Sequence, residues 1–199
     1  MTLDLKNRFP VFSKKPNLVF FDTAASALKV DSMIKAISNC YSFEYANIHR
    51  GMYDLSAQLT KRYEESRVLV SKFINAPSEK NIIFTKSATE GINLVSSCLS
   101  ENYFNEGDEV LVSNLEHHAN LVPWHLISKK IQIISANLNF EGDIDYNDLI
   151  SKINSKTKLV AITHMSNVTG SITNIEKISK VTKKLNIPLL VDGCQFTPH

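Results

Sequence analysis

The 199-residue sequence predicts an α/β protein, with a mostly parallel β-sheet and helices on both faces of that sheet. Short apolar runs alternate with amphipathic helical patterns along most of the chain, and this alternation is typical of parallel strands joined by right-handed crossovers. The apolar runs are continuous, as in Leu159-Val160-Ala161-Ile162, which indicates strands buried on both faces. Hydrophobic residues make up 43% and charged residues 21% of the chain, the composition of an ordinary globular protein.

The N-terminal part of the chain carries one short apolar run and two helical patterns. We expect a strand at residues 18–21 and a helix that Asp31 caps. The longest helical pattern covers residues 56–74, with charged side chains on one side and apolar ones, including Phe73, on the other.

From residue 81 onward, strand and helix patterns alternate regularly. The expected strands are residues 81–85, 109–112, 131–136, 159–164 and 188–192. The expected helices are residues 89–99, 121–129, 145–153 and 174–185. We find no internal repeat and no linker rich in proline or glycine.

Charge and cysteine content exclude several classes of function. The net charge is only +2, from 22 basic and 20 acidic residues, so neither nucleic acid nor an anionic membrane is an expected partner. The three cysteines form no C-x-x-C pair, which argues against a disulfide framework and a zinc site and favours a reducing compartment. Without an apolar leader or a run of about 18 apolar residues, a soluble cytoplasmic protein is expected.

The binding crevice of a parallel sheet lies at the carboxyl ends of its strands. Polar segments follow four of the expected strands there, at residues 86–91, 114–118, 164–167 and 192–195. We therefore expect function to reside in these segments.

Each segment allows a chemical and a purely structural interpretation. Residues 85–91 place small residues and hydroxyls at the start of a helix, which suits a phosphate but also an ordinary helix cap. Asp192 can pair with a cationic ring nitrogen, a metal or a sugar hydroxyl, or it can cap the next turn. In Glu116-His117-His118, one imidazole is expected to point into the crevice and the other into the wall. Nothing at ligand spacing supports a metal site.

A phosphate turn, a stacking histidine and a carboxylate for a pyridinium are together what pyridoxal 5'-phosphate requires, because the ring acts as an electron sink while the protein orients it. Seven sequence blocks carry a resemblance in that direction. They are residues 21–26 (Phe-Asp-Thr-Ala-Ala-Ser), 47–51 (Asn-Ile-His-Arg-Gly), 55–57 (Leu-Ser-Ala), 89–95 (Thr-Glu-Gly-Ile-Asn-Leu-Val), 116–124 (Glu-His-His-Ala-Asn-Leu-Val-Pro-Trp), 163–168 (Thr-His-Met-Ser-Asn-Val) and 191–195 (Val-Asp-Gly-Cys-Gln). With these blocks the chain resembles Suf-type (group II) cysteine desulfurases, which are fold-type-I pyridoxal phosphate enzymes in a family that also includes selenocysteine lyases.

The resemblance implies a role for five cofactor-binding residues. Ala88 and Thr89 would hold the cofactor phosphate at a helix N-terminus. His117, the catalytic residue, would stack on the pyridine ring, with the adjacent histidine structural. Asp192 would pair with the ring nitrogen, and Gln195 would donate a hydrogen bond to the phenolic oxygen.

The resemblance also implies a reaction and its partners. L-Cysteine would be converted to alanine with the sulfur held as an enzyme persulfide, and His49 and Asn167 would face this substrate. A sulfur-acceptor protein of the Suf type would then carry the sulfur to iron–sulfur cluster assembly, and the complete enzyme would be a homodimer. The alternatives are a selenocysteine lyase, or a non-catalytic remnant or partner-binding half.

The sequence reaches only seven residues beyond Asp192, from 192 to 199. The family's Ser-Gly-His-Lys segment, whose lysine forms the Schiff base, and its persulfide cysteine lie later. The resemblance therefore implies an N-terminal arm at residues 1–20 and an incomplete cofactor-binding large domain at residues 21–199, without the small domain. On this interpretation the chain alone is expected to be inactive.

Overall fold

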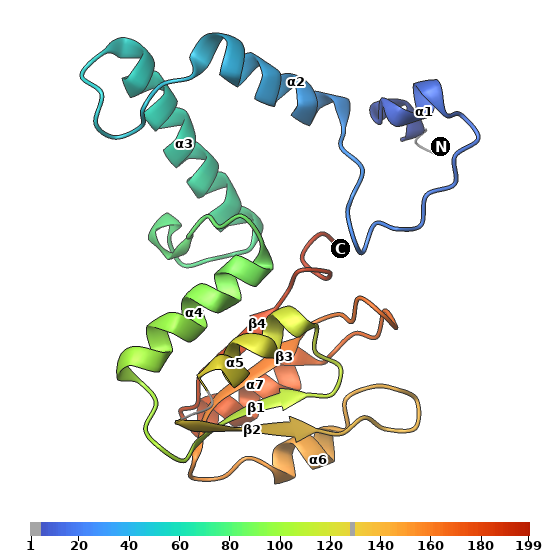
Figure 1. Cartoon of the computed structure of the whole chain (residues 1–199), viewed down its shortest axis with the longest axis vertical. Coiled ribbons are helices and arrows are strands. Elements are labelled where there is room, and N and C mark those ends of the chain that lie inside the picture. The colour runs from blue at the N-terminus through green and yellow to red at the C-terminus, as the bar shows by residue number, and fades with distance from the viewer. Residues whose placement is uncertain (1–4, 128–129) are drawn as a thin grey trace. The chain divides into compact units, whose positions relative to one another are not determined.

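The computed structural model describes residues 5–127 and 130–199. The chain divides into two compact units: unit 1 ends at Ile83 and unit 2 begins at Phe84. Figure 1 shows helices and connecting segments in unit 1, and a β-sheet with helices around it in unit 2.

The described part of unit 1 forms helices. Its elements are η1 (Lys6–Arg8), α1 (Val11–Lys14), α2 (Asp31–Asn39), the π-helical segment η2 (Cys40–Glu44), α3 (Asp54–Phe73) and η3 (Glu79–Asn81). The long helix expected at residues 56–74 is confirmed as α3. It stops where Asn75 takes a positive φ of 54°, because a left-handed residue interrupts the helical hydrogen-bond pattern.

Unit 2 alternates helices and strands, as the sequence predicts. Its elements are α4 (Ala88–Asn102), β1 (Asp108–Ser113), η4 (His118–Asn120), α5 (Val122–Leu126), β2 (Ile131–Ala136), α6 (Tyr146–Ser151), β3 (Thr157–Thr163), α7 (Ile175–Lys184) and β4 (Leu189–Asp192). Within the described ranges, no helix of either unit is long and apolar enough to cross a membrane.

The described strands form one sheet in the order β2-β1-β3-β4, and all three pairings are parallel. The chain leaves β1 toward β2 on one side and returns to add β3 on the other side. Such a reversal opens a crevice between the carboxyl ends of the two central strands, here β1 and β3. The predicted α/β class with a parallel sheet is confirmed.

Two apolar clusters cover the two faces of the sheet. On one face, Val110 and Ala161 pack with Ile92 of α4 and Trp124 of α5. The opposite-face cluster contains the strand residues Leu111, Val160 and Ile162 together with Leu149 of α6 and Ile178 of α7. Consecutive strand residues point to opposite faces, so a strand covered on both sides must be apolar at every position. This explains the continuous apolar runs in the sequence.

Two expected strands do not form. The expected strands at residues 18–21 and 81–85 pair with no other strand in the described parts of the chain, and Asn81 instead ends η3. An apolar run becomes a strand only when a neighbour accepts its hydrogen bonds. Parts of both runs are open to solvent, with Phe21 at 93% and Ile83 at 71% exposure, whereas the neighbouring Ile82 is buried.

Three details of the helices also differ from expectation. The N-cap of α2 is Val30, without a side-chain cap, whereas Asp31 is the first helical residue and pairs with Lys35 at 2.6 Å. Phe73 does not lie on a buried face, since it is 72% exposed. The helix expected at residues 121–129 is confirmed only over α5, and residues 128–129 lie outside the described ranges.

Candidate functional site

The carboxyl ends of β1, β3 and β4 lie side by side at one edge of the sheet. Thr163, the last residue of β3, pairs in register with Asp192, the last residue of β4. β1 lies on the other side of β3, and its last residue is Ser113. The segments after these strands therefore share one edge, and these segments contain most of the site residues that the sequence predicts.

Asp192 presents a carboxylate at this edge while remaining only 7% exposed. Its Oδ1 accepts the backbone N–H of Cys194 at 3.0 Å, and its carbonyl oxygen accepts the N–H of His164 at 2.9 Å. Within the described residues no hydrogen bond reaches Oδ2. The Asp therefore caps the following turn, as one of the two sequence interpretations expects, and its Oδ2 is available to a ligand.

His117 lies in the turn after β1 and is the N-cap of η4. Its Nδ1 accepts the backbone N–H of Ala119 at 3.1 Å, so in the neutral ring the proton lies on Nε2. The ring meets His118 edge-on, with centroids 6.1 Å apart. Both imidazoles are exposed, so the expectation that one of them points into the wall is wrong for this chain. The two histidines are adjacent in a short turn, where consecutive side chains need not point to opposite sides as they do in a strand.

Glu116 is the residue of this turn that sequence reasoning leaves without a role. Ser113 Oγ donates to its Oε1 at 2.6 Å, and Asn120 Nδ2 donates to its Oε2 at 2.7 Å. Burial raises the pKa of the Glu116 carboxyl to about 7, against the lowering effect of these hydrogen bonds. The Glu-His-His motif was visible in the sequence, but no local signal indicates that its glutamate is largely enclosed.

The N-terminus of α4 carries the expected turn. Ser87 caps the helix by accepting the N–H of Glu90 at 3.2 Å. The Glu90 carboxylate accepts the N–H of Lys86, one residue before the N-cap, and the two bonds together form a variant of the capping box. Within the described residues, the backbone N–H groups of Ala88 and Thr89 have no hydrogen-bond partner. These two exposed donors at the positive end of the helix dipole can bind an anion.

Asn167 and Gln195 also lie beyond strand ends. Asn167 is exposed in the turn after β3, where Ser166 Oγ accepts the N–H groups of Val168 and Thr169 at 3.2 Å. Gln195 is partly buried in the turn after β4.

The turns after β3 and β4 also contact each other. The His164 ring stacks on Phe196 with a centroid separation of 3.5 Å and an interplanar angle of 25°. Burial lowers the pKa of His164. This contact joins the turns that carry Asn167 and Gln195.

His49 belongs to unit 1. It has a positive φ of 69°, and its N–H donates to Thr60 Oγ1 at 2.9 Å. Its Nε2 lies 3.5 Å from Glu64 Oε1, and its ring meets Tyr63 edge-on. A non-glycine residue in the left-handed region is uncommon and often occurs at functional positions.

The predicted site residues thus fall into two groups. Unit 2 holds six of them, namely Ala88, Thr89, His117, Asn167, Asp192 and Gln195, whereas His49 lies in unit 1. Of these six, the four that follow strands β1, β3 and β4 share the carboxyl edge of the sheet. In the described ranges, no three His, Cys, Asp or Glu residues are grouped so as to hold a metal ion.

A parallel α/β sheet with an anion-binding helix start and a carboxylate at its carboxyl edge defines a class of cofactor- or ligand-binding domains. Residues 19–199 match the class-V aminotransferase family, and the chain belongs to that family.

Several known proteins resemble the chain over nearly its whole length. It is 39% identical over 202 residues to the cysteine desulfurase of Wigglesworthia glossinidia brevipalpis, a match that covers 98% of this chain and 49% of that relative. It is also 39% identical to the cysteine desulfurase SufS of Plasmodium falciparum, covering 98% of this chain and 37% of the relative. The crystal structure of the cysteine desulfurase CsdA from Escherichia coli superposes with a TM-score of 0.86 at 33% identity, covering 98% of this chain and 49% of that one. The chain thus spans about half the length of these relatives, or less.

Proposed function

We propose that this chain is part of a pyridoxal phosphate-dependent cysteine desulfurase, which converts L-cysteine to alanine and transfers the sulfur to a Suf-type acceptor protein. The observation that carries the proposal is the similarity over 98% of the chain to proteins named cysteine desulfurase, in both sequence and structure. The assignment concerns the whole protein, of which the chain corresponds to the N-terminal half of those relatives.

The residues present fit the cofactor. The unpartnered N–H groups of Ala88 and Thr89 suit its phosphate, and the available oxygen of Asp192 suits a protonated ring nitrogen. His117 has an exposed ring, oriented by the N–H of Ala119, that would stack on the pyridine face, and Gln195 would donate a hydrogen bond to the phenolic oxygen. When bound, this cofactor supplies an electron sink for the bond cleavages at the amino acid.

The protein residues would hold and orient the reactants. Asp192 keeps the ring nitrogen charged, because a carboxylate with low exposure pairs strongly with a cation. We assign His49 and Asn167 to the substrate amino acid. For the domain organisation, we propose an arm at residues 1–20 followed by part of a cofactor-binding domain at residues 21–199.

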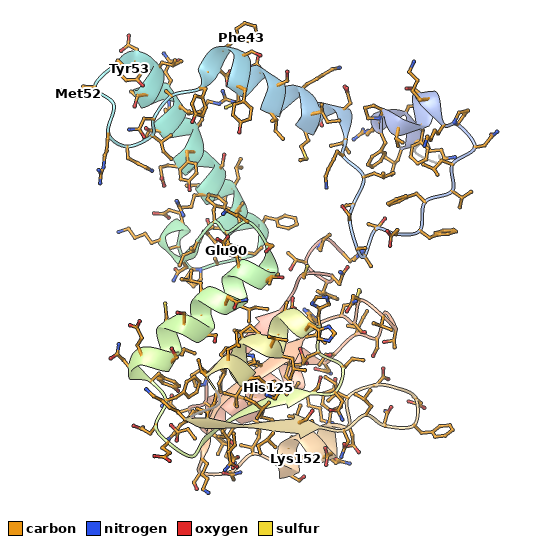
Figure 2. The ribbon with its side chains drawn as sticks, viewed as in Figure 1. Phe43, Met52, Tyr53, Glu90, His125 and Lys152 are labelled. Carbon is orange, nitrogen blue, oxygen red and sulfur yellow. The ribbon has the colours of Figure 1, made fainter. Side chains whose placement is uncertain are left out.

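The partners and the location are part of the same proposal. The exposed apolar side chains of unit 1, including Phe43 and Met52 at 77% and 102% exposure, support a homodimer in which protein covers them. Figure 2 shows these two side chains projecting from unit 1. The described cysteines Cys40, Cys98 and Cys194 are all free, which supports the reducing compartment of a cytoplasmic protein. The role in iron–sulfur cluster assembly is proposed from the resemblance to Suf-type enzymes alone.

The test is to purify the whole protein with pyridoxal phosphate and to assay alanine and sulfide formation from L-cysteine. The Asp192→Asn variant should retain some cofactor and lose most turnover. A hydrogen bond to a charged group contributes about 1.5–3 kcal/mol, which corresponds to a loss of roughly 10- to 150-fold. Near-normal desulfuration by Asp192→Asn would contradict the role of this carboxylate, and absence of alanine formation by the wild-type protein would contradict the function.

The two adjacent histidines provide a matched pair of variants. His117→Ala should change the absorbance spectrum of the bound cofactor, because the stacked ring is lost. His118→Ala should leave that spectrum unchanged. The reverse pattern would assign the stacking role to the other histidine.

A further inference from the structure

The Glu116 carboxyl connects three separate elements of unit 2. It accepts hydrogen bonds from Ser113 at the end of β1 and from Asn120 in η4, at 2.6 and 2.7 Å. The backbone N–H of Thr163, at the end of β3, also faces this carboxyl and lowers its pKa. The residue next to Glu116 is His117, so this carboxyl fixes the base of the turn that carries the proposed stacking ring.

The surroundings of this carboxyl leave little freedom in its hydrogen-bond pattern. Trp124 Nε1 donates to Asn120 Oδ1 at 3.3 Å, which turns the Asn120 amino group toward Glu116. Asn120 and Trp124 are both fully buried. Ser113 Oγ accepts the N–H of Leu115 at 3.2 Å and therefore has its own hydrogen available for the carboxylate. When the carboxyl is protonated, only this bond to Ser113 can reverse direction, since the amide donors cannot accept.

Glu116 also senses the charge of Asp192. Burial is the largest cause of its raised pKa of about 7, and the negative charge of Asp192 raises it further. The other titratable groups at these strand ends are His164 after β3, Cys194 after β4, and His117 and His118 on its own turn. None of them contributes a resolved charge effect on Glu116. A cation that pairs with Asp192 would offset the repulsion between the two carboxylates.

We propose that Glu116 is the positioning residue of this site: it anchors the His117 turn to the ends of β1 and β3, and it releases a proton to solvent when a cationic group pairs with Asp192. The second part rests on the proposed function only for the identity of that cation, which would be the protonated ring nitrogen of the cofactor. Binding of a cation to Asp192 is then linked to the charge of the Glu116 carboxyl, which holds the turn that carries His117.

The first experiment needs neither cofactor nor substrate. The carboxyl carbons of ¹³C-labelled glutamate are titrated by NMR in the full-length protein, and the Glu116 resonance is identified by its loss in Glu116→Gln. The wild-type midpoint should lie near pH 7, and Asp192→Asn should lower it, because the negative charge of Asp192 is one cause of the raised pKa. The exposed Glu176 serves as the internal control, whose resonance should not respond to Asp192→Asn. An unchanged Glu116 midpoint in Asp192→Asn would overturn the coupling.

The second experiment measures protons released on binding pyridoxal phosphate, by calorimetry at pH 7 in buffers of different ionisation enthalpy. The wild-type protein should release up to about half a proton more than Glu116→Gln, because a group at its pKa is half protonated. Equal release by both proteins would overturn the link to the cofactor. If neither protein binds the cofactor, the proposed function fails, and the titration of Asp192→Asn still decides whether the two carboxyls are coupled.

The anchoring role has its own measurement. Glu116→Gln keeps an acceptor for Asn120 and Thr163 and a donor for Ser113, so the His117 ring resonances should stay sharp. Glu116→Ala leaves those donors without an acceptor, so the same resonances should shift or broaden. Identical His117 spectra in the wild-type, Gln and Ala proteins would overturn the positioning role.

Discussion

The two units of the chain bury their apolar residues in different ways. In unit 2, Leu111, Val160 and Ile162 are fully buried between the sheet and the helices that cover it. In the described part of unit 1, large side chains such as Phe43 and Met52 remain open to solvent. An open groove of ≈ 910 Å³ in unit 1 is bordered by α2, η2 and α3. A parallel sheet covered on both faces makes its own core, whereas the helices of unit 1 present apolar surface that, by its exposure, is suited to contact with further protein.

The largest expected difference between the units is the loss of unfolding free energy when an isoleucine is shortened to alanine. Ile162→Ala removes a fully buried side chain from unit 2 and should destabilise that unit by about 2–5 kcal/mol. Ile34→Ala removes a side chain of α2 that is 45% exposed and should cost less than about 1 kcal/mol. Urea unfolding followed by circular dichroism measures both values. Equal losses would show that unit 1 has a core comparable to that of unit 2.

The next largest effect is a pH dependence confined to unit 2. The pKa of Glu116 is about 7 in the folded chain, above its usual 4.5. Its contribution to stability is therefore complete below pH 4.5 and is lost as the pH rises through 7. The loss amounts to about 3 kcal/mol, since one pKa unit corresponds to about 1.4 kcal/mol.

Replacing this carboxyl isolates its share of the pH dependence. Glu116→Gln should make the free energy of unfolding flatter between pH 4.5 and 8, as measured by urea denaturation at each pH. The control Glu176→Gln changes a side chain that is 77% exposed and should leave the curve as in the wild type. A wild-type slope in Glu116→Gln would show that other groups carry the dependence.

Helix caps give a smaller difference. α4 of unit 2 has a capping box, so Ser87→Ala should destabilise it by about 1 kcal/mol. The N-cap of α2 in unit 1 is Val30, which is extended and forms no side-chain cap, so Val30→Ser should stabilise that helix by roughly 0.5–1 kcal/mol. Amide hydrogen exchange in the first turn of each helix reports the two effects. Slower exchange after Ser87→Ala, or no change after Val30→Ser, would contradict this account.

Exposed ion pairs should show the smallest effect and no difference between the units. Asp31–Lys35 in α2 and Glu176–Lys180 in α7 are both i,i+4 pairs, at 2.6 and 2.7 Å. Lys35→Ala and Lys180→Ala should each cost at most about 0.5 kcal/mol, because solvent screens exposed charges. Unfolding at low and at high salt measures each pair. A large, salt-insensitive loss at either position would identify a contact beyond the ion pair.

Much of unit 2 follows from local pattern. The apolar runs predict β1–β4 to within about two residues, and the polar residues that follow them predict the edge where Asp192 and His117 lie. The strands expected at residues 18–21 and 81–85 do not form, because a strand depends on a partner strand that no local sequence encodes.

The sequence by itself therefore determined the α/β class, the parallel strands and the identity of the residues at their ends, because periodicity and strand-end position are local properties. Only the tertiary structure decided which of those residues meet. It enclosed Glu116 between Ser113 and Asn120, and this burial raises the pKa of the Glu116 carboxyl. It also left both His117 and His118 exposed. Burial and the distances between charges depend on segments far apart in the chain, and for that reason the pKa of Glu116 could not be read from the Glu-His-His motif.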